Sequence, residues 1–350
     1  MSEREGSSAL FTRCLSCDIP FSATPILEGY CLGDEVAFDP RRGRLWAICR
    51  VCRRWTLAPL EERWEALEEL ECLARGGTEG ADGARLLSRT DNVALFQAGP
   101  LRMVRVGPTD RREEAWWRYG RRLQALDARD RPRSLGASLA LAAAVVTGGL
   151  KAAVHGLPAM APREIDRWLR FGDYAWRGHR TCAGCGHVVR SLPFFDRKIL
   201  VLTPVDEPRG VPLLSRRCPR CKNLDGGGLH LDPRQSERTL RRVLAYEHHA
   251  GLPEGRVRSA LALIEQAGRP SALAATLARF GRSIGDLPST AAIAMDIAAN
   301  EGVERRLLSL EVSVLQQYWR QEEELAAIVD GELTPSGPLD RIRLAALGEP

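Results

Sequence analysis

The sequence contains very little lysine. Only three of its 50 basic residues are lysine, and the others are arginine. A net charge of +5 is in the direction expected of a nucleic-acid-binding protein, but 45 acidic residues nearly balance the bases. An arginine-rich composition is as typical of a GC-rich genome as of phosphate binding, so the global charge selects no class of partner.

Several catalytic and targeting signals are also missing. The sequence has no G-x-S-x-G motif, no Walker loop and no glycine-rich dinucleotide fingerprint, and Glu247-His248-His249 lacks the H-E-x-x-H spacing of a catalytic zinc site. We therefore expect no enzyme of these classes, while an active site of another kind is left open. Residues 1–8 are polar and carry acidic side chains, so we expect no secretory signal and a cytoplasmic protein.

Cysteine is where the sequence is unusual. Eight of its ten cysteines form four C-x-x-C units, and in a chain without an export signal such doublets are typical of metal-binding thiolates rather than disulfides. Zinc prefers four tetrahedral ligands, which two doublets supply. The sequence therefore predicts two structural Zn²⁺ ions, one held by Cys14, Cys17, Cys49 and Cys52 and the other by Cys182, Cys185, Cys218 and Cys221.

The two sets of cysteines have nearly equal spacing. The doublets are separated by 31 residues in the first set and by 32 in the second. A turn-like segment precedes the third cysteine in each, Asp39-Pro40-Arg41-Arg42-Gly43 in one and Asp206-Glu207-Pro208-Arg209-Gly210 in the other. A duplicated unit and a chance similarity both fit these observations.

These doublets resemble the zinc-ribbon superfold, in which two knuckles lie on β-hairpins with a small sheet between them. Cys182-Ala183-Gly184-Cys185-Gly186, with a glycine after its second cysteine, is the closer match. The resemblance covers about 80 of the 350 residues and implies an inserted hairpin or loop in each ribbon. Zinc ribbons serve transcription factors, ribosomal proteins, enzyme subunits and adaptors, so the resemblance implies a fold and no single function.

The spacing of apolar residues predicts the helices and strands in the rest of the chain. We expect an α+β multidomain protein with two small β zinc ribbons, a mixed helical and hairpin middle and an all-α C-terminal domain. The domains are predicted at 1–76 (first ribbon and an acidic helix), 77–174 (β-hairpin, arginine-rich helix and apolar helical segment), 175–230 (second ribbon) and 231–350 (helices). Strands are expected at 45–48, 55–57, 92–98, 101–106, 187–190, 198–203 and 211–214, and helices near 59–74, 110–128, 163–171, 232–250, 254–267, 271–280 and 289–329.

The last of these helices has a regular apolar face. Its second half repeats apolar residues at steps of three and four, with Gln321 as the polar exception. The pattern favours either antiparallel packing on the shorter helices or self-association as a coiled coil. The face consists of Leu307, Leu310, Val314, Tyr318, Gln321, Leu325 and Ile328.

Basic residues crowd the third and fourth cysteines of each set and are candidates for contact with nucleic acid or a protein partner. Trp46 and Trp55 could stack on bases or form the small core of the first ribbon. Cys31 is predicted to be a small buried residue, with a fifth ligand or a reactive thiol as alternatives, and Cys72 a small buried residue. The candidate contacts are Arg41, Arg42, Arg50, Arg53, Arg54, Arg209, Arg216, Arg217, Arg220 and Lys222.

The segment Leu135–Leu157 is rich in Ala, Gly, Leu and Val. A buried helix, a hairpin that touches a membrane and a membrane span all fit it, and the buried helix is favoured because Gly148-Gly149 interrupts the run. The leading functional hypothesis is an interaction scaffold that binds another protein or its own copies. The alternatives are a zinc-ribbon nucleic-acid-binding protein, a membrane-associated regulator and an enzyme with an unrecognised site.

Overall fold

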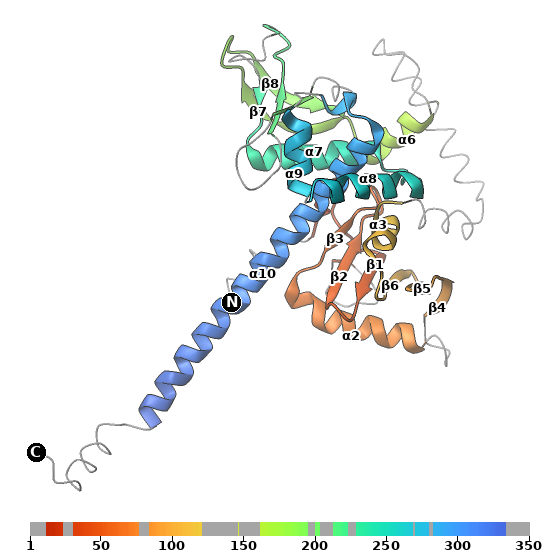
Figure 1. The fold of residues 1–350 in the computed structure, drawn as a ribbon, viewed down its shortest axis with the longest axis vertical. Coiled ribbons are helices and arrows are strands. Elements are labelled where there is room, and N and C mark those ends of the chain that lie inside the picture. The colour runs from red at the N-terminus through yellow and green to blue at the C-terminus, as the bar shows by residue number, and fades with distance from the viewer. Residues whose placement is uncertain are drawn as a thin grey trace, which may run out of the picture. The chain divides into compact units, whose positions relative to one another are not determined.

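The computed structural model describes residues 12–23, 31–76, 84–120, 146, 162–194, 200–203, 213–222, 229–268, 270–279 and 283–333. The chain forms two compact units, Met1–Gly302 and Val303–Pro350. The predicted α+β class is confirmed, because a six-stranded sheet, smaller β-structures and a long C-terminal helix are all present (Figure 1).

The largest β-structure is the six-stranded sheet of the first unit. Its strand order is β3-β2-β1-β6-β5-β4, with β1 and β6 parallel and the other neighbours antiparallel. The pairing of β1 with β6 joins residues from both sides of the predicted boundary at residue 76, and the four-part division of the chain stays a prediction. The strands are β1 (Glu35–Asp39), β2 (Arg44–Ile48), β3 (Trp55–Leu57), β4 (Arg85–Arg89), β5 (Val93–Ala98) and β6 (Leu101–Val106).

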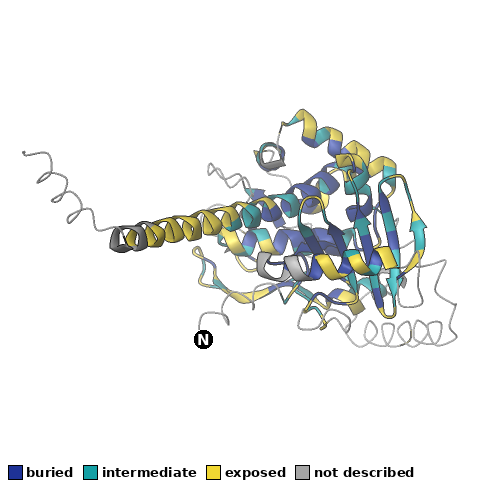
Figure 2. Ribbon diagram, turned by 90° about the horizontal axis from the view of Figure 1, so that it is seen from below, coloured by how far each residue is buried: buried dark blue, intermediate teal, exposed yellow. Residues whose placement is uncertain are grey.

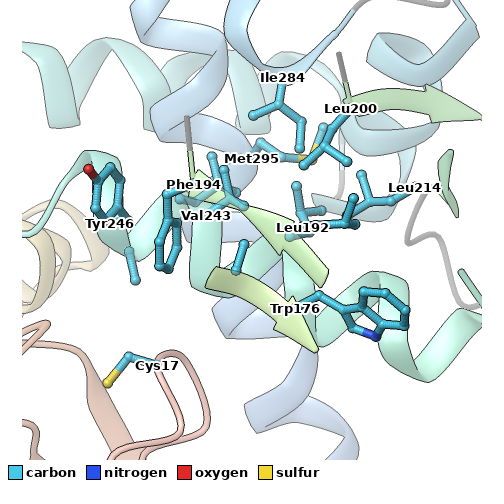
Figure 3. Close-up of a cluster of buried hydrophobic side chains, with 14 of the residues drawn as sticks. Cys17, Trp176, Leu192, Phe194, Leu200, Leu214, Val243, Tyr246, Ile284 and Met295 are labelled. Carbon is cyan, nitrogen blue, oxygen red and sulfur yellow. The ribbon is translucent and has the colours of Figure 1, made fainter. Parts of the chain in front are cut away.

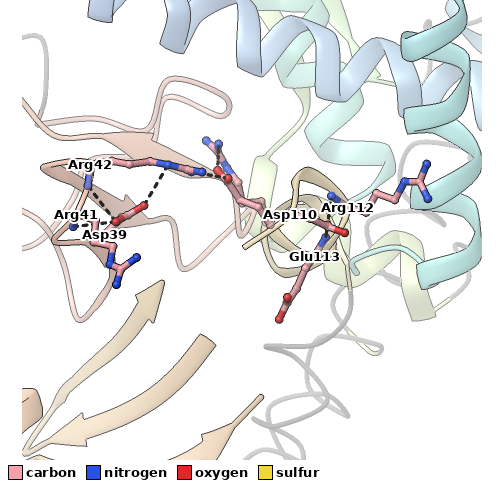
Figure 4. Close-up of polar contacts among 8 residues, drawn as sticks. Asp39, Arg41, Arg42, Asp110, Arg112 and Glu113 are labelled. Atoms are coloured by element: carbon pink, nitrogen blue, oxygen red, sulfur yellow. Dashed lines mark hydrogen bonds and ion pairs between the residues drawn. The ribbon is translucent and has the colours of Figure 1, made fainter. Parts of the chain in front are cut away.

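Two tight turns set the register of this sheet. Asp39 Oδ1 accepts hydrogen bonds from the backbone N–H groups of Arg41 (3.0 Å) and Arg42 (3.1 Å), as Figure 4 shows. Gly43 then takes a φ of +60°, which suits glycine, and the chain turns from β1 back onto β2. Gly99, with a φ of +52°, has the same role between β5 and β6. The turns expected at both places are confirmed.

Two helices belong to the part of the chain that forms this sheet, one between β3 and β4 and one after β6. In α2 (Leu60–Gly76), Leu67 and Leu70 are buried in one core cluster with Phe38 and Leu45 of the sheet. This arrangement follows from the apolar spacing of the helix, which gathers its leucines on one face.

The second of these helices, α3 (Arg111–Tyr119), begins at a capped position. The Asp110 carboxylate accepts the backbone N–H groups of Arg112 and Glu113 (2.6 and 2.7 Å; Figure 4). Asp110 and Glu113 have the spacing that predicts a capping box, but the Glu113 carboxylate instead accepts hydrogen bonds from Thr90 and Asn92. The residues after Gly120 that were predicted to continue this helix lie outside the described part of the chain.

The second metal region contains two small sheets. A two-stranded hairpin pairs β7 with β8, and a separate sheet has the order β11-β10-β9. The amphipathic helix α6 (Pro162–Phe171) precedes them and ends at Gly172, whose φ is +75°. The strands are β7 (Tyr174–Thr181), β8 (Val188–Pro193), β9 (Leu200–Thr203), β10 (Leu213–Arg216) and β11 (Leu229–His230).

From residue 232 the described chain is helical, as predicted. The Asp232 side chain accepts the Gln235 N–H and Pro233 occupies the first turn, so α7 has both N-terminal signals read from the sequence. Residues of β8, β9, β10 and α7 share one core cluster with the first four-cysteine group, part of which Figure 3 draws. The elements are α7 (Pro233–Glu247), α8 (Glu254–Gln266), α9 (Pro270–Arg279), the 3-10 turn η2 (Ile284–Asp286) and α10 (Ser289–Leu333).

Within the described ranges, no helix is both long enough and apolar enough to cross a membrane. The segment Leu135–Leu157, for which a membrane contact was one of the alternatives, falls outside these ranges except for Val146.

Candidate metal centres

The first four-cysteine group lies where two separate turns meet. One doublet sits between the paired residues Arg13 and Pro20, and the other forms the turn from β2 to β3. The Sγ atoms of the four cysteines all lie within 4.8 Å of one another. Cys14 Sγ is 3.5 Å from Cys52 Sγ, and Cys17 Sγ is 3.5 Å from Cys49 Sγ.

The second group has the same composition. Cys182 and Cys185 form the turn of the β7–β8 hairpin, and Cys218 and Cys221 follow β10 directly. The closest sulfur pairs are Cys182 with Cys221 at 3.7 Å and Cys185 with Cys218 at 3.5 Å. The predicted metal ligands are therefore brought together in two sets of four, and each set could hold a metal ion.

All four doublets have one backbone geometry. In each, the residue after the second cysteine has a positive φ and donates its N–H to the carbonyl oxygen of the first cysteine at 2.8–2.9 Å. Three of these residues are not glycine, so the left-handed conformation is enforced by the turn rather than by the residue type. They are Asp18 (φ 66°), Arg53 (φ 59°), Gly186 (φ 68°) and Lys222 (φ 57°).

Backbone amides also approach the sulfurs in the same way in both groups. The N–H of Ser16 donates to Cys14 Sγ, and that of Arg220 donates to Cys218 Sγ, each at 3.4 Å. Such hydrogen bonds stabilise a thiolate more than a thiol, because they favour the charged form. The turns therefore prepare the sulfurs to act as ligands.

The sulfur geometry fits a tetrahedral ion. A metal–sulfur distance of about 2.3 Å places two tetrahedral ligands about 3.8 Å apart, close to the observed separations. Four sulfur donors in tetrahedral array are typical of zinc or of an iron centre. Since four protein ligands fill such a shell, neither group leaves a coordination position for a substrate.

The thiols of each group differ in acidity. Burial raises the pKa of Cys14, but hydrogen bonds from Cys17, Cys49 and Cys52 outweigh it and hold that pKa well below its ordinary value. Burial raises the pKa of Cys52, and its three neighbours raise it further.

A similar difference appears in the second group. The backbone N–H of Cys221 lowers the pKa of Cys218 to about 6, against desolvation, with further help from the N–H of Arg220. Each group thus contains one cysteine whose pKa is lowered, which favours the thiolate, the form that binds a metal.

The first group is tied to two helices by polar contacts. Ser16, inside the first doublet, donates to Asn300 of α10 at 2.7 Å. Arg54, two residues after Cys52, is 2% exposed and forms an ion pair with Asp296 of α10, which is fully buried. Asp18 pairs with Arg238 of α7. Both doublets are therefore anchored to helices that lie more than 180 residues further along the chain.

Asp296 is the centre of this polar network. Besides Arg54 it contacts His248 Nδ1 at 2.8 Å, and its Oδ1 accepts a hydrogen bond from Asn300 at 2.9 Å. Burial raises the pKa of Asp296, but the Arg54 guanidinium and His248 outweigh it and hold the pKa below its ordinary value. Arg54 also lies over the Tyr119 ring, 5.2 Å from its centroid. This network was not predicted from the sequence, although a single carboxylate within the apolar stretch Ala291–Ala299 is a signal for it.

The second group is more accessible. The first four cysteines are at most 1% exposed, whereas Cys185 is partly exposed and Cys221 is exposed. Cys182 and Cys218 are buried. Figure 2 colours the buried residues dark blue and the exposed residues yellow. The second group is thus partly exposed to solvent.

The predicted contact arginines of the first group are mostly engaged with acids. Besides the buried Arg54, Arg53 pairs with Glu35, and Arg42 contacts both Asp39 (3.6 Å) and Glu114 (3.2 Å). Arg41 and Arg50 are exposed. Around the second group Arg217, Arg220 and Lys222 are exposed, Arg216 is partly buried and Arg209 lies outside the described residues.

The tryptophans of the first ribbon belong to its core. Trp46 and Trp55 are 0% and 7% exposed, and their ring centroids lie 5.6 Å apart. The Arg118 guanidinium lies over both rings, at 5.5 and 5.6 Å from their centroids. Of the two predicted roles, core packing therefore holds, and neither ring is available for stacking on a base.

The two remaining cysteines correct a prediction. Cys31 and Cys72 are both exposed, so their expected burial is wrong. Neither belongs to a four-cysteine group.

The side chains of His248 and His249 reach different acids, Asp296 and Asp166. Adjacent residues at the end of a helix point in different directions, so His248 and His249 do not share a metal site.

No family model matches the chain, and neither a curated protein nor a solved structure matches it. The two four-cysteine groups are consistent with zinc-ribbon-like sites. The strand order around them differs, since the hairpin turn carries the second doublet in the first group and the first doublet in the second group. A common origin of the two units stays a prediction.

Proposed function

We propose that the protein is a scaffold stabilised by two structural zinc ions that associates with a second copy of itself through α10. Zinc is the ion chosen because it has no redox chemistry and prefers closed tetrahedral sulfur sites. With both shells filled by protein ligands, the ions support the fold and leave binding to other surfaces.

The observation that carries the association is the exposed apolar face in the second half of α10. Among residues 303–333, all of which belong to this helix, the predicted face is largely open to solvent. Burying one such side chain contributes about 1.5–3 kcal/mol, so a partner that covers the face gains a large driving force. The exposed fractions are Leu310 60%, Val314 64%, Tyr318 55%, Leu325 56% and Ile328 57%.

A second copy suits this face better than an unrelated helix. From Leu307 to Ile328 the seven positions of the face are joined by six steps that add up to 21, a mean spacing of 3.5 residues. A repeat of about 3.5 is that of a left-handed coiled coil. The side chain of Gln321 is polar and needs a hydrogen-bonding partner once it is buried.

The direction of the pair follows from Gln321. In a parallel, in-register dimer the two Gln321 amides face each other and can hydrogen-bond. In an antiparallel pair centred on the face, Gln321 would oppose Val314 and lose that partner. Polar residues at one core position are known to fix register in this way. The proposed assembly is therefore a parallel dimer.

The test is the molar mass of the full zinc-loaded chain in solution, measured by light scattering across a concentration series. The wild type should be a dimer, and V314E/L325E should be a monomer because two like charges would be buried in the seam. The matched control is S309E/Q316E, which adds the same charges to positions outside the face and should remain a dimer.

A monomeric wild type at every concentration would overturn the proposal, as would equal dissociation of the control. Direction is tested by a disulfide. With Gln321→Cys, a parallel dimer should cross-link under mild oxidation, whereas an antiparallel pair should not. Circular dichroism of each variant distinguishes loss of pairing from loss of the helix.

A further inference from the structure

The two metal regions differ in charge. The sequence from residue 13 to 57 has seven Arg or Lys residues against five Asp or Glu, whereas residues 174–222 have ten against three. The described parts of the second region, 174–194 and 213–222, contain seven Arg or Lys residues and no acid at all. A zinc ion with four thiolates adds two negative charges, so this surface remains positive.

Five of the seven basic side chains in the described parts of the second region are also exposed to solvent. Two lie on the β7–β8 hairpin and three beside the second doublet, while Arg180 instead contacts Asp232 and Gln235. In the first region Arg53 pairs with Glu35 and the buried Arg54 pairs with Asp296, while Arg41 and Arg50 are exposed. The exposed set is Arg177, Arg190, Arg217, Arg220 and Lys222.

Exposed basic side chains on two segments that contain no acidic residue form a candidate surface for phosphate groups. Arginine binds phosphate with two parallel N–H···O bonds, and duplex nucleic acid offers one negative charge per roughly 1.7 Å of its axis. Proteins that hold single strands add exposed aromatic rings on which bases stack. Here Trp176 is only 7% exposed and the Arg177 guanidinium lies over the Tyr174 ring at 4.7 Å, so neither of these two rings is free to stack on a base.

We infer that the second metal region binds the phosphate backbone of double-stranded nucleic acid, without reading its sequence. The β7–β8 hairpin (Figure 1) and the knuckle after β10 carry the contact residues. The four cysteines of the second group come from these two segments and join them. This binding goes beyond the proposed scaffold and does not depend on α10.

The experiment is a fluorescence anisotropy titration of the full zinc-loaded chain with fluorescent DNA and RNA duplexes and the matching single strands. Measured at about 50 and about 200 mM salt, duplex affinity should fall steeply, with a logarithmic slope of about −0.9 for each phosphate contacted. The duplexes should bind more tightly than the single strands, because their charge density is higher. The DNA and RNA arms show which duplex is preferred.

The variant R190Q/R217Q/R220Q should weaken duplex binding at about 50 mM salt at least about tenfold and reduce the magnitude of the slope by up to about 2.7. The control R85Q/R89Q/R256Q removes three equally exposed arginines elsewhere and should change both values little. A second variant, R177Q/R190Q, changes only hairpin residues away from the cysteines, so it tests the surface even if the first variant loses its zinc.

Absence of duplex binding at about 50 mM salt would overturn the inference, since phosphate contacts are strongest there. Equal losses in the variants and the control would also overturn it, because the effect would then come from net charge. Tighter binding of the single strands, or of polyglutamate, would instead indicate a stacking site or an acidic protein partner and would contradict it.

Discussion

The first and second metal groups share one four-cysteine knuckle geometry in different surroundings. The first group is buried, and its flanking Ser16 and Arg54 reach α10, while Asp18 reaches α7. The first doublet of the second group lies on a hairpin turn, and Cys221, Arg217 and Arg220 of this group are exposed. The cysteine spacing therefore determines the knuckle, and the neighbouring residues decide whether the site supports the core or lies on an accessible surface.

The largest expected effect comes from removing one ligand of each group. Cys17→Ser should lower the free energy of unfolding by at least about 3 kcal/mol, because metal binding and folding are coupled. Hydrogen exchange should rise in α7 and in residues 289–302 as well as around the doublets. Cys185→Ser should raise exchange only in 174–194 and 213–222. If both variants raised hydrogen exchange throughout the described chain, the proposed difference between the two sites would be wrong.

The next effect separates two arginines that each lie close to a doublet. Arg54→Met should cost about 3–5 kcal/mol, because it leaves the buried Asp296 without its ion-pair partner. Arg217→Met, the matched change at the exposed site, should stay within about 0.5 kcal/mol. Urea denaturation of the two variants measures both values. Equal costs would show that Arg54 is not the link between the first group and α10.

A smaller effect should appear in the pH dependence of stability. The folded pKa of Asp296 is lowered, so its contribution is fully present above the unfolded value of about 3.9 and is lost as the pH falls through the folded pKa. The stability difference between the wild type and Asp296→Asn should therefore shrink with acidification below about pH 4. Denaturation at several pH values checks this. A difference that is constant down to the lowest pH would contradict the lowered pKa.

The eight metal ligands and most helices could be predicted from the sequence because their signals are local. A C-x-x-C spacing places two sulfurs on one turn, and the Asp232-Pro233 start and Gly251 stop bound a helix within a few residues. The β5–β6 hairpin was equally readable, since Gly99-Pro100 separates two apolar runs.

The long-range pairings could not be predicted in this way. Nothing near β1 indicates that its parallel neighbour is β6, because that pairing joins Val36 to Met103 across many intervening residues. The local sequence of Arg54 does not distinguish it from neighbouring exposed arginines. The ion pair with the distant Asp296 offsets the free-energy cost of burying its charge. The exposure of Cys31 and Cys72 likewise depends on which distant residues pack beside them, and the local sequence does not indicate this.

The most direct test of the two-site account is native mass spectrometry of the zinc-loaded chain during a chelator time course. The account predicts two zinc ions per chain in the wild type. The zinc of the second group should be lost first, because two of its cysteines are accessible, and this loss is the fast step of the time course. Cys185→Ser, which disrupts the second group, should lack the fast step, whereas Cys17→Ser should keep it. Fewer than two ions, or a fast step that survives in Cys185→Ser and disappears in Cys17→Ser, would contradict the account.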